Sequence, residues 1–219
     1  MSSQENEKRL KVLDCATLSD ALDRLAIAGQ CAKIAPRGEH FELTGRAFTI
    51  RYESASKPPG TVGDYIDDVS PGMILMLDNR GREDCTVWGD ILTEIAFRRQ
   101  LGGTVIDGIC RDVSLCRQNG YPVFARAHWM RTGKDRVQVD GLQVPVSIGG
   151  VRVLPGDLVR GDADGVVVIP ALHENAVLDA ADAISHAESA IRELTRDGTR
   201  LDEARAAHGY HQLQSAKSK

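Results

Sequence analysis

Between residues 72 and 127, apolar runs of strand length alternate with stretches in which apolar residues recur every three or four positions. Strand, helix, strand, helix, strand is the order of parallel βαβ units, whose strands are covered on both faces and read as apolar runs. The pattern therefore predicts strands over 72–78, 104–107 and 123–127, with a helix over 90–101 and a shorter helix ending at 118. Upstream, it predicts a helix over 17–28 with Thr17 as N-cap, a strand over 47–52 and a short acidic helix or turn over 60–69.

The pattern changes after residue 137, where short strand-like pieces are separated by glycine turns such as Asp164-Gly165. Residues 171–207 then form an alanine-rich helical stretch, interrupted at Asp197-Gly198. Its apolar positions predict one buried stripe, formed by Val177, Ala180, Ile184 and Ile191. Because no repeat or linker interrupts the sequence, we expect a single domain over 1–219 with a helical extension over about 171–208.

The composition and charge of the chain argue against several classes of function. The net charge is -4 at pH 7, so the basic footprint of a nucleic-acid-binding protein is missing. No apolar run approaches the roughly 20 residues that span a bilayer, and the N-terminus lacks the apolar core of a signal peptide. The five cysteines are dispersed, without a Cys-x-x-Cys motif, which favours reduced thiols. We expect a cytoplasmic protein that binds neither nucleic acid nor membranes.

Two short segments carry the candidate chemistry. Gly89-Asp90 begins the helix predicted over 90–101, and Arg111-Asp112 follows the strand predicted over 104–107. Strand ends and helix starts converge on one crevice in α/β sheets. The free amides of Ile91 and Leu92 there could bind a carboxylate. Arg111 could bind the same anion with its guanidinium fork, and Asp112 could hold a divalent cation. Together they predict a site for an oxo-acid bound to a metal.

Each of these residues also has a plainer interpretation. Most adjacent charged residues, such as Arg111 and Asp112, form exposed ion pairs without function. Asp90 is a favoured helix N-cap residue, although a capping Asp90 at the crevice could also orient a water or accept a proton. The third candidate is a carboxylate cluster that is more simply a solvated acidic helix start than a cation site; it comprises Asp64, Asp67 and Asp68.

These residues resemble those of the 4-hydroxy-4-methyl-2-oxoglutarate aldolase family, which shares its fold with the RraA-like regulators of ribonuclease activity. The resemblance covers roughly residues 14–195. It rests on Gly-Asp at 89–90, Gly-Gly-Thr-Val-Ile-Asp-Gly at 102–108, Arg-Asp at 111–112, Tyr-Pro-Val-Phe-Ala at 121–125, and the run from Gly-Gly-Val-Arg-Val to Gly-Val-Val-Val-Ile-Pro over 149–170.

The resemblance implies an α/β/β sandwich similar to the phosphohistidine swivelling domain, assembled as a homotrimer or homohexamer with sites between subunits. It implies that Arg111 binds the carboxylate and carbonyl region of the substrate, and that Asp112 anchors Mg²⁺ or Mn²⁺, partly through water. Asp90 would belong to the active-site water network. The turn from Gly89 to Leu92 would bind the pyruvate carboxylate through the amides of Ile91 and Leu92. A neighbouring subunit would add an acidic residue, for which Glu188 and Glu193 are candidates by location.

The residues and the resemblance together predict a class II pyruvate aldolase that also decarboxylates oxaloacetate, since both reactions share the pyruvate enolate. Arg111 and Asp90 are the catalytic candidates and Asp112 the metal ligand. The alternative is an RraA-like regulator that binds proteins and does no chemistry. The family's regulators often lack the aspartate of the Arg-Asp pair, so Asp112 favours the enzyme. The part of the substrate beyond the pyruvoyl unit would be bound by loops, with Arg37, Lys57 and His128 as unranked candidates.

Overall fold

Parallel strands form the centre of the sheet in the computed structural model, which describes residues 3–210. They are β2 (Leu43–Ser54), β3 (Ile74–Thr86), β4 (Gly103–Cys110) and β5 (Val123–His128). Every residue of β4 is buried, as expected of a strand covered on both faces. Helices α3 (Asp90–Arg98) and α4 (Val113–Asn119) make the two crossovers from β3 to β4 and from β4 to β5. The predicted parallel βαβ units are therefore present.

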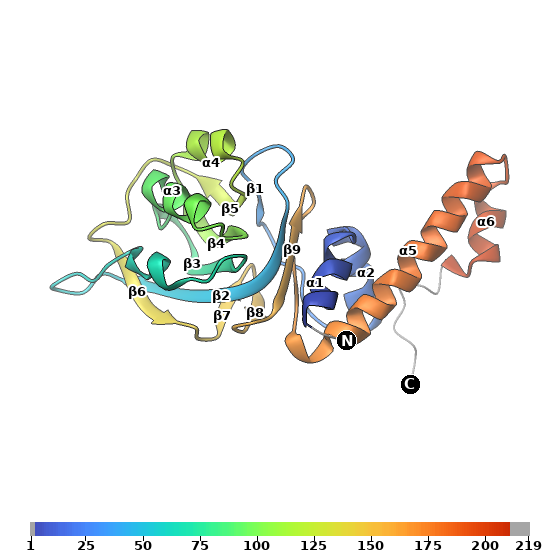
Figure 1. Cartoon of the computed structure of the whole chain (residues 1–219), viewed down its shortest axis with the longest axis horizontal. Coiled ribbons are helices and arrows are strands. Elements are labelled where there is room, and N and C mark those ends of the chain that lie inside the picture. Colours follow the sequence, from blue (N-terminus) through green and yellow to red (C-terminus); the bar gives the residue numbers. More distant parts are fainter. Residues whose placement is uncertain (1–2, 211–219) are drawn as a thin grey trace.

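The layers agree with the predicted fold class. Helices α3 and α4 lie on one side of β3, β4 and β5, and the hairpin of β7 (Val146–Ile148) and β8 (Val151–Val153) lies on the other (Figure 1). Strand β1 (Ala35–Pro36) pairs with the outer edge of β5, and the 3₁₀ helix η1 (Asp64–Asp68) packs against α3. The molecule is thus a mixed α/β protein with a helical layer, a central sheet and a second β layer, as the α/β/β sandwich requires.

Strand β2 joins the central sheet to the rest of the molecule. Its first residues pair with β9 (Leu158–Asp162), its middle with β3, and its last residues with β6 (Val137–Leu142). β9 continues into β10 (Gly165–Ile169) through a tight turn in which the Asp162 carboxylate accepts the Asp164 N–H at 3.0 Å. Residues 162–165 therefore form a hairpin turn as the sequence predicts, with Ala163 and Asp164 as its two central residues and Gly165 as the first residue of β10.

Helices α1 (Ser3–Lys11), α2 (Cys15–Arg24) and α5 (Glu174–Arg196) pack beside the β9–β10 hairpin around a second hydrophobic cluster. Polar contacts join α1 to α5: Arg9 pairs with Asp179 and Asp182 at 2.7 and 2.6 Å, and Glu174 bonds with Asn6 and Arg46. Glu174 is buried. Burial alone raises a carboxyl pKa, but the hydrogen bonds from Arg46 and Asn6 leave the Glu174 pKa below its usual value.

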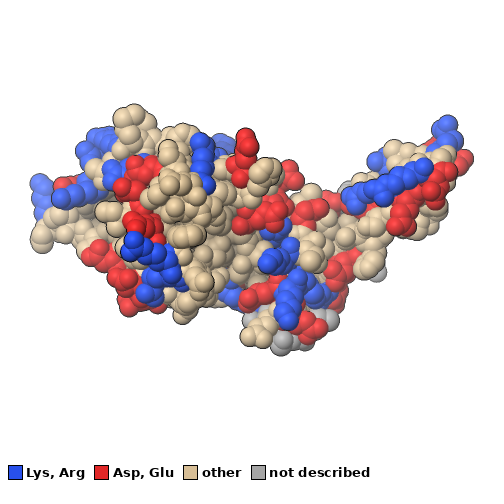
Figure 2. Space-filling view, turned by 45° about the horizontal axis from the view of Figure 1, so that its top comes forward, with Lys and Arg blue, Asp and Glu red and all other residues tan. Residues whose placement is uncertain are grey.

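The helical extension was predicted with its interruption in the right place. The 3₁₀ helix η2 (Ala171–His173) precedes α5, and α6 (Leu201–Ala207) turns back along it after Asp197-Gly198. Within the predicted stripe, Val177 and Ile184 are buried in the second cluster and Ala180 is partly buried against it. The outer part of α5 and α6 project from the body (Figure 1), and Lys, Arg, Asp and Glu are interspersed along this arm (Figure 2).

Several boundaries differ from the predictions. Thr17 is not the N-cap of α2: Asp14 is, and its carboxylate accepts the Thr17 N–H at 2.7 Å. Helix α1 was not predicted, because its apolar residues are too few to show helical spacing. Strand β3 continues beyond Asp78 to Thr86 through a register shift. Within residues 3–210, no helix is both long and apolar enough to cross a bilayer.

Candidate active site

The structure brings Gly89-Asp90 and Arg111-Asp112 together at the carboxyl ends of β3 and β4. Oδ2 of Asp112 accepts the Asp90 N–H at 3.1 Å and lies 3.1 Å from Nε of Arg111. The Arg111 N–H donates to the Trp88 carbonyl at 3.0 Å. A Cβ on Gly89 would lie 2.9 Å from Asp112 Oδ2, so a side chain there would displace the Asp112 carboxylate. The carboxylate and the guanidinium therefore lie directly beside the start of α3.

Asp112 has a left-handed backbone conformation, with φ 56° and ψ 37°. This region is unfavourable for most residues, and aspartate and asparagine tolerate it best among those with a Cβ. Asp112 occupies the N-cap position of α4, yet its carboxylate makes no capping hydrogen bond to that helix. Instead the side chain reaches across to α3. Strained backbone at such a position is characteristic of functional sites.

The start of α3 differs from the prediction in two details. Gly89, not Asp90, is the N-cap residue, and Asp90 is the first helical residue. Oδ1 of Asp90 accepts the Ile91 N–H at 2.8 Å, so this amide is not free as expected. The Leu92 N–H has no protein acceptor among the described residues. An anion bound at the helix start could therefore still gain the Leu92 N–H as a backbone donor.

A cavity of about 460 Å³ opens beside this helix start and includes Arg111 in its wall. Its other walls come from η1 and from the loop that follows β5. The lining residues of α3 are apolar apart from Asp90, and the charged residues in the other walls include Asp64, Asp67 and Lys134. Asp64 and Asp67 of the acidic segment therefore line the same cavity as Arg111, whereas Asp68 does not. Asp67 also lies 3.9 Å from Arg99.

Lys134 was missed by the sequence analysis. It lies in a loop that approaches β3 closely: Thr132 forms a bridge with Thr86, and a Cβ on Gly133 would lie 2.2 Å from the Thr86 carbonyl oxygen. This contact joins residues far apart in sequence, so no local motif reveals it. The sequence analysis suggested three other loop residues for binding the part of the substrate beyond the pyruvoyl unit. None of them lines the cavity; they are Arg37, Lys57 and His128.

A larger cleft, of about 640 Å³, lies elsewhere, between α1 and the β2–β9 pair. It includes Gly102, which precedes β4 and so marks the amino end of that parallel strand. Ligand sites of open α/β sheets lie at the carboxyl ends of the strands instead. We therefore take the smaller cavity as the candidate site.

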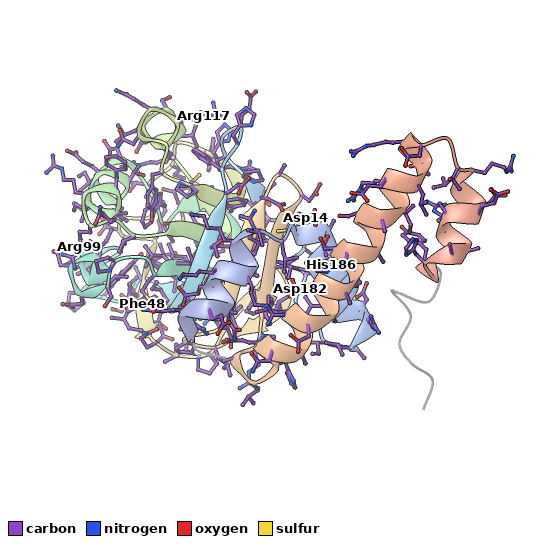
Figure 3. The ribbon with its side chains drawn as sticks, turned by 45° about the vertical axis from the view of Figure 1, so that its right-hand side comes forward. Asp14, Phe48, Arg99, Arg117, Asp182 and His186 are labelled. Carbon is purple, nitrogen blue, oxygen red and sulfur yellow. The ribbon has the colours of Figure 1, made fainter. Side chains whose placement is uncertain are left out.

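The acidic residues suggested for a neighbouring subunit's contribution lie on α5. Glu188 pairs there with Arg192 at 2.8 Å, and neither Glu188 nor Glu193 lines the cavity. Figure 3 shows Arg99 and Arg117, from the α3 and α4 region, at the other end of the molecule from Asp182 and His186 of α5. Within one chain, this stretch of α5 is thus remote from the candidate site.

The described residues hold no group of three or more His, Cys, Asp or Glu side chains arranged to bind a metal. A cation held by Asp112, which pairs with Arg111, would therefore need its remaining ligands from elsewhere. Oδ1 of Asp112 has no recorded protein partner in the described chain, and the side chain is 39% exposed. One carboxylate with water and substrate oxygens is a common ligand set for Mg²⁺.

The fold and site define a mixed α/β protein with an arginine, a carboxylate and a helix start at the carboxyl edge of a parallel sheet. A family model described as RraA-like, Aldolase/RraA, matches residues 15–168. The chain belongs to this family, as its sequence motifs indicated.

Similar proteins cover different shares of the chain. Protein DlpA of Legionella pneumophila is 38% identical over 208 residues, which are 92% of this chain but 34% of that protein. The chain thus spans about a third of its length. A Halalkalibacterium halodurans protein, whose name proposes a 4-hydroxy-4-methyl-2-oxoglutarate aldolase, is 33% identical over 79% of this chain and 80% of its own.

Solved structures agree with the fold. An uncharacterized protein from Pseudomonas syringae pv. tomato is 38% identical, with a TM-score of 0.87 over 93% of this chain and 98% of that one. RraAS2 of Streptomyces coelicolor, described as an unusual member of the RNase ES inhibitor RraA protein family, is 26% identical, with a TM-score of 0.79 over 88% and 99%. The family therefore includes proteins named for enzymatic and for regulatory roles.

Proposed function

We propose that the protein is a divalent-metal-dependent carbon–carbon lyase that cleaves 2-oxo acids of the 4-hydroxy-4-methyl-2-oxoglutarate type to pyruvate and also decarboxylates oxaloacetate. One observation supports the proposal above the others: the Asp112 carboxylate lies 3.1 Å from both the Asp90 amide and the Arg111 guanidinium, and Asp90 and Arg111, though not Asp112 itself, line a cavity beside a helix start. The aldolase named among its relatives supports it.

The substrate carboxylate would bind between Arg111 and the start of α3. A guanidinium offers two parallel donors to a carboxylate, and the Leu92 N–H adds a backbone donor where the helix dipole is positive. The Ile91 N–H could join them only by releasing the Asp90 carboxylate, from which it now lies 2.8 Å. The release would free Asp90 to interact with water or substrate, so binding and activation of Asp90 would be linked.

Asp112 would hold the cation, Mg²⁺ or Mn²⁺, through an oxygen ligand of the kind that these hard ions prefer. Bound there, the cation would act as a Lewis acid that polarises the oxo group. Asp112 also pairs with Arg111, so its carboxylate would orient the guanidinium at the same time.

Aldol cleavage needs a base, whereas decarboxylation does not. In the first reaction, a water held by Asp90 would take the proton of the C4 hydroxyl. The C3–C4 bond breaks, its electron pair stays on C3 as the enolate of pyruvate, and C4 leaves as the carbonyl carbon of a second oxo acid. In oxaloacetate the same bond breaks with loss of CO₂. Arg111 would stabilise the enolate oxygen in both cases, and protonation of C3 gives pyruvate.

We further propose that the site is completed in a homotrimer or homohexamer. Asp112 is the one acidic residue that pairs with Arg111 in the described chain, and Ile91, in the first turn of α3, is 69% exposed. A neighbouring copy could cover this edge and add an acidic ligand such as Glu188 or Glu193. Light scattering on the purified protein measures the assembly, and a monomer with full activity contradicts this part of the proposal.

The second candidate function is a non-catalytic regulator that binds a ribonuclease. The similarity to RraAS2, whose described family is an inhibitor of RNase ES, favours it. The two functions differ in what Arg111 and Asp112 do, because a binding surface needs no divalent cation at Asp112.

The deciding experiment measures pyruvate release from 4-hydroxy-4-methyl-2-oxoglutarate and from oxaloacetate with Mg²⁺, and again with EDTA. We expect metal-dependent turnover that Arg111→Ala reduces by at least about 100-fold, as loss of an oxyanion donor does elsewhere. Arg98→Ala is the matched control, since Arg98 is exposed at the end of α3, does not line the cavity and pairs only with Glu94 among described acidic residues. Activity unaffected by EDTA or by Arg111→Ala would refute the proposal.

A further inference from the structure

A buried hydroxyl lies directly behind the candidate site. Oγ1 of Thr93 donates to the Gly89 carbonyl at 2.9 Å, accepts the Trp88 indole N–H at 2.9 Å and lies 3.3 Å from Sγ of Cys116. A hydroxyl has one hydrogen to donate and two lone pairs. Since its hydrogen goes to Gly89, the Cys116 thiol is the donor of the third bond. Burial raises the pKa of this thiol, which keeps it protonated for that role.

Each partner of Thr93 belongs to a different part of the site. Gly89 is the N-cap of α3, and Trp88 accepts the Arg111 N–H on its carbonyl at 3.0 Å. Cys116 lies one turn into α4, where its sulfur is 3.9 Å from the carbonyl oxygen of Asp112. We call Trp88, Thr93 and Cys116 the buried brace. It contacts the Gly89-Asp90 segment and the Arg111-Asp112 segment from behind.

The brace is itself anchored to the sheet. The Trp88 ring stacks on the Tyr121 ring, with 6.1 Å between centroids and 11° between planes. The Tyr121 hydroxyl is 2.9 Å from Oγ1 of Thr104, the second residue of β4. These side chains are all buried. The brace therefore has a fixed position relative to β4 and β5.

The exposed side chains of the site, Arg111 and Asp112, are not held in such a fixed position. The Arg111 and Asp112 side chains are 37% and 39% exposed, and exposed ion pairs hold their geometry weakly. Reacting groups need to be held within about half an ångström of their productive positions. The geometry points to Thr93 as a positioning residue, which, through Trp88 and Cys116, sets the relative placement of the Gly89-Asp90 and Arg111-Asp112 segments. Its effect on turnover rests on the proposed lyase function.

The test compares Thr93→Val, which keeps the shape and removes the hydroxyl, with Thr93→Ser, which keeps the hydroxyl. We expect Thr93→Val to lower kcat for pyruvate release by about 10- to 100-fold, the range that a misplacement of about 1 Å can cause. Thr93→Ser should retain most of the activity. Ile184→Val, in the second hydrophobic cluster, is the control for lower stability alone and should leave kcat unchanged.

Amide hydrogen exchange gives a readout that needs no activity. The Asp90 N–H bonds to Asp112 and the Arg111 N–H bonds to Trp88, so both should exchange faster in Thr93→Val but not in Thr93→Ser or Ile184→Val. Faster exchange in Thr93→Val supports the brace even where the wild type proves to be no lyase. Unchanged exchange at both amides, or a wild-type kcat in Thr93→Val, overturns it. Where Thr93→Val does not fold, Cys116→Ala removes one bond and should shift both readouts less, in the same direction.

Discussion

The left-handed backbone of Asp112 allows its structural and chemical roles to be separated. Replacement by asparagine keeps a residue that tolerates φ 56° and an oxygen that can accept the Asp90 N–H. Replacement by alanine keeps neither. Both changes remove the negative charge next to Arg111. We therefore expect both variants to lose the metal-dependent activity, while they differ in stability.

The stability difference can be estimated. A left-handed conformation costs a residue with an ordinary Cβ about 1–2 kcal/mol, part of which aspartate already bears. Loss of the Asp90 hydrogen bond at an exposed position adds about 0.5 kcal/mol. Asp112→Ala should therefore be about 1–2 kcal/mol less stable than the wild type, which lowers Tm by about 2–8 °C in a chain of this size. Asp112→Asn should remain within about 0.5 kcal/mol of the wild type.

Urea unfolding, scanning calorimetry and the coupled pyruvate assay measure both effects on the same samples. Asp112→Gly is a useful third variant, since glycine adopts this backbone freely and should be more stable than Asp112→Ala. Equal stability of the alanine, glycine and asparagine variants would refute the backbone argument. Full activity of Asp112→Asn in Mg²⁺ would refute the assignment of the cation to the carboxylate.

Other predictions follow from the contacts around the site and the core. Gly89→Ala should abolish most activity with little loss of stability, because its Cβ would lie 2.9 Å from Asp112 Oδ2 while the backbone is extended; unchanged kcat would contradict this. Glu174→Gln should lower Tm at neutral pH. Because the folded pKa of Glu174 is depressed, its contribution is present above the unfolded value and is lost as pH falls through the folded one, so the difference from wild type should shrink below about pH 4. A constant difference down to pH 2 would contradict the linkage. The cysteines are all buried, and burial raises the pKa to about 12 for Cys31 and Cys110, so a thiol reagent at pH 8 should modify the native protein far more slowly than the unfolded chain; rapid native labelling of these thiols would disprove it.

Much of the sheet could be predicted because its pattern is local. The strand predicted over 104–107 became β4, whose buried residues read as an apolar run, and the helix start at Gly89-Asp90 follows from glycine and aspartate before an amphipathic stretch. By contrast, Asp14 and Thr17 are both acceptable N-caps, and only the position of α2 in the fold decides between them. Helix α1 depends on polar contacts of Arg9 and Asn6 with α5, which no local pattern shows.

The residues of the candidate site also fall into those that a local sequence pattern reveals and those that it does not. Gly89, Arg111 and Asp112 could be found because each lies at the end of a predicted strand or the start of a predicted helix. Lys134 could not, because its loop reaches the cavity through the Thr86–Thr132 bridge, across more than forty residues of sequence. Thr93 was equally hidden. A buried threonine in a helix looks the same in sequence whether it only fills space or links several backbone segments.

Strand β2 connects the two hydrophobic clusters, and this connection affects how the molecule unfolds. Its residues contribute to the central hydrophobic cluster through Ile50, and its amino end pairs with β9, which contributes Leu158 to the second cluster. Neither cluster can open fully without breaking hydrogen bonds to the same strand. We therefore expect the two clusters to melt in one cooperative transition, and the central amides of β2 to be among the slowest in the described chain to exchange. A stabilising ligand bound beside α3 would then protect the helices at the far end of the sheet as well.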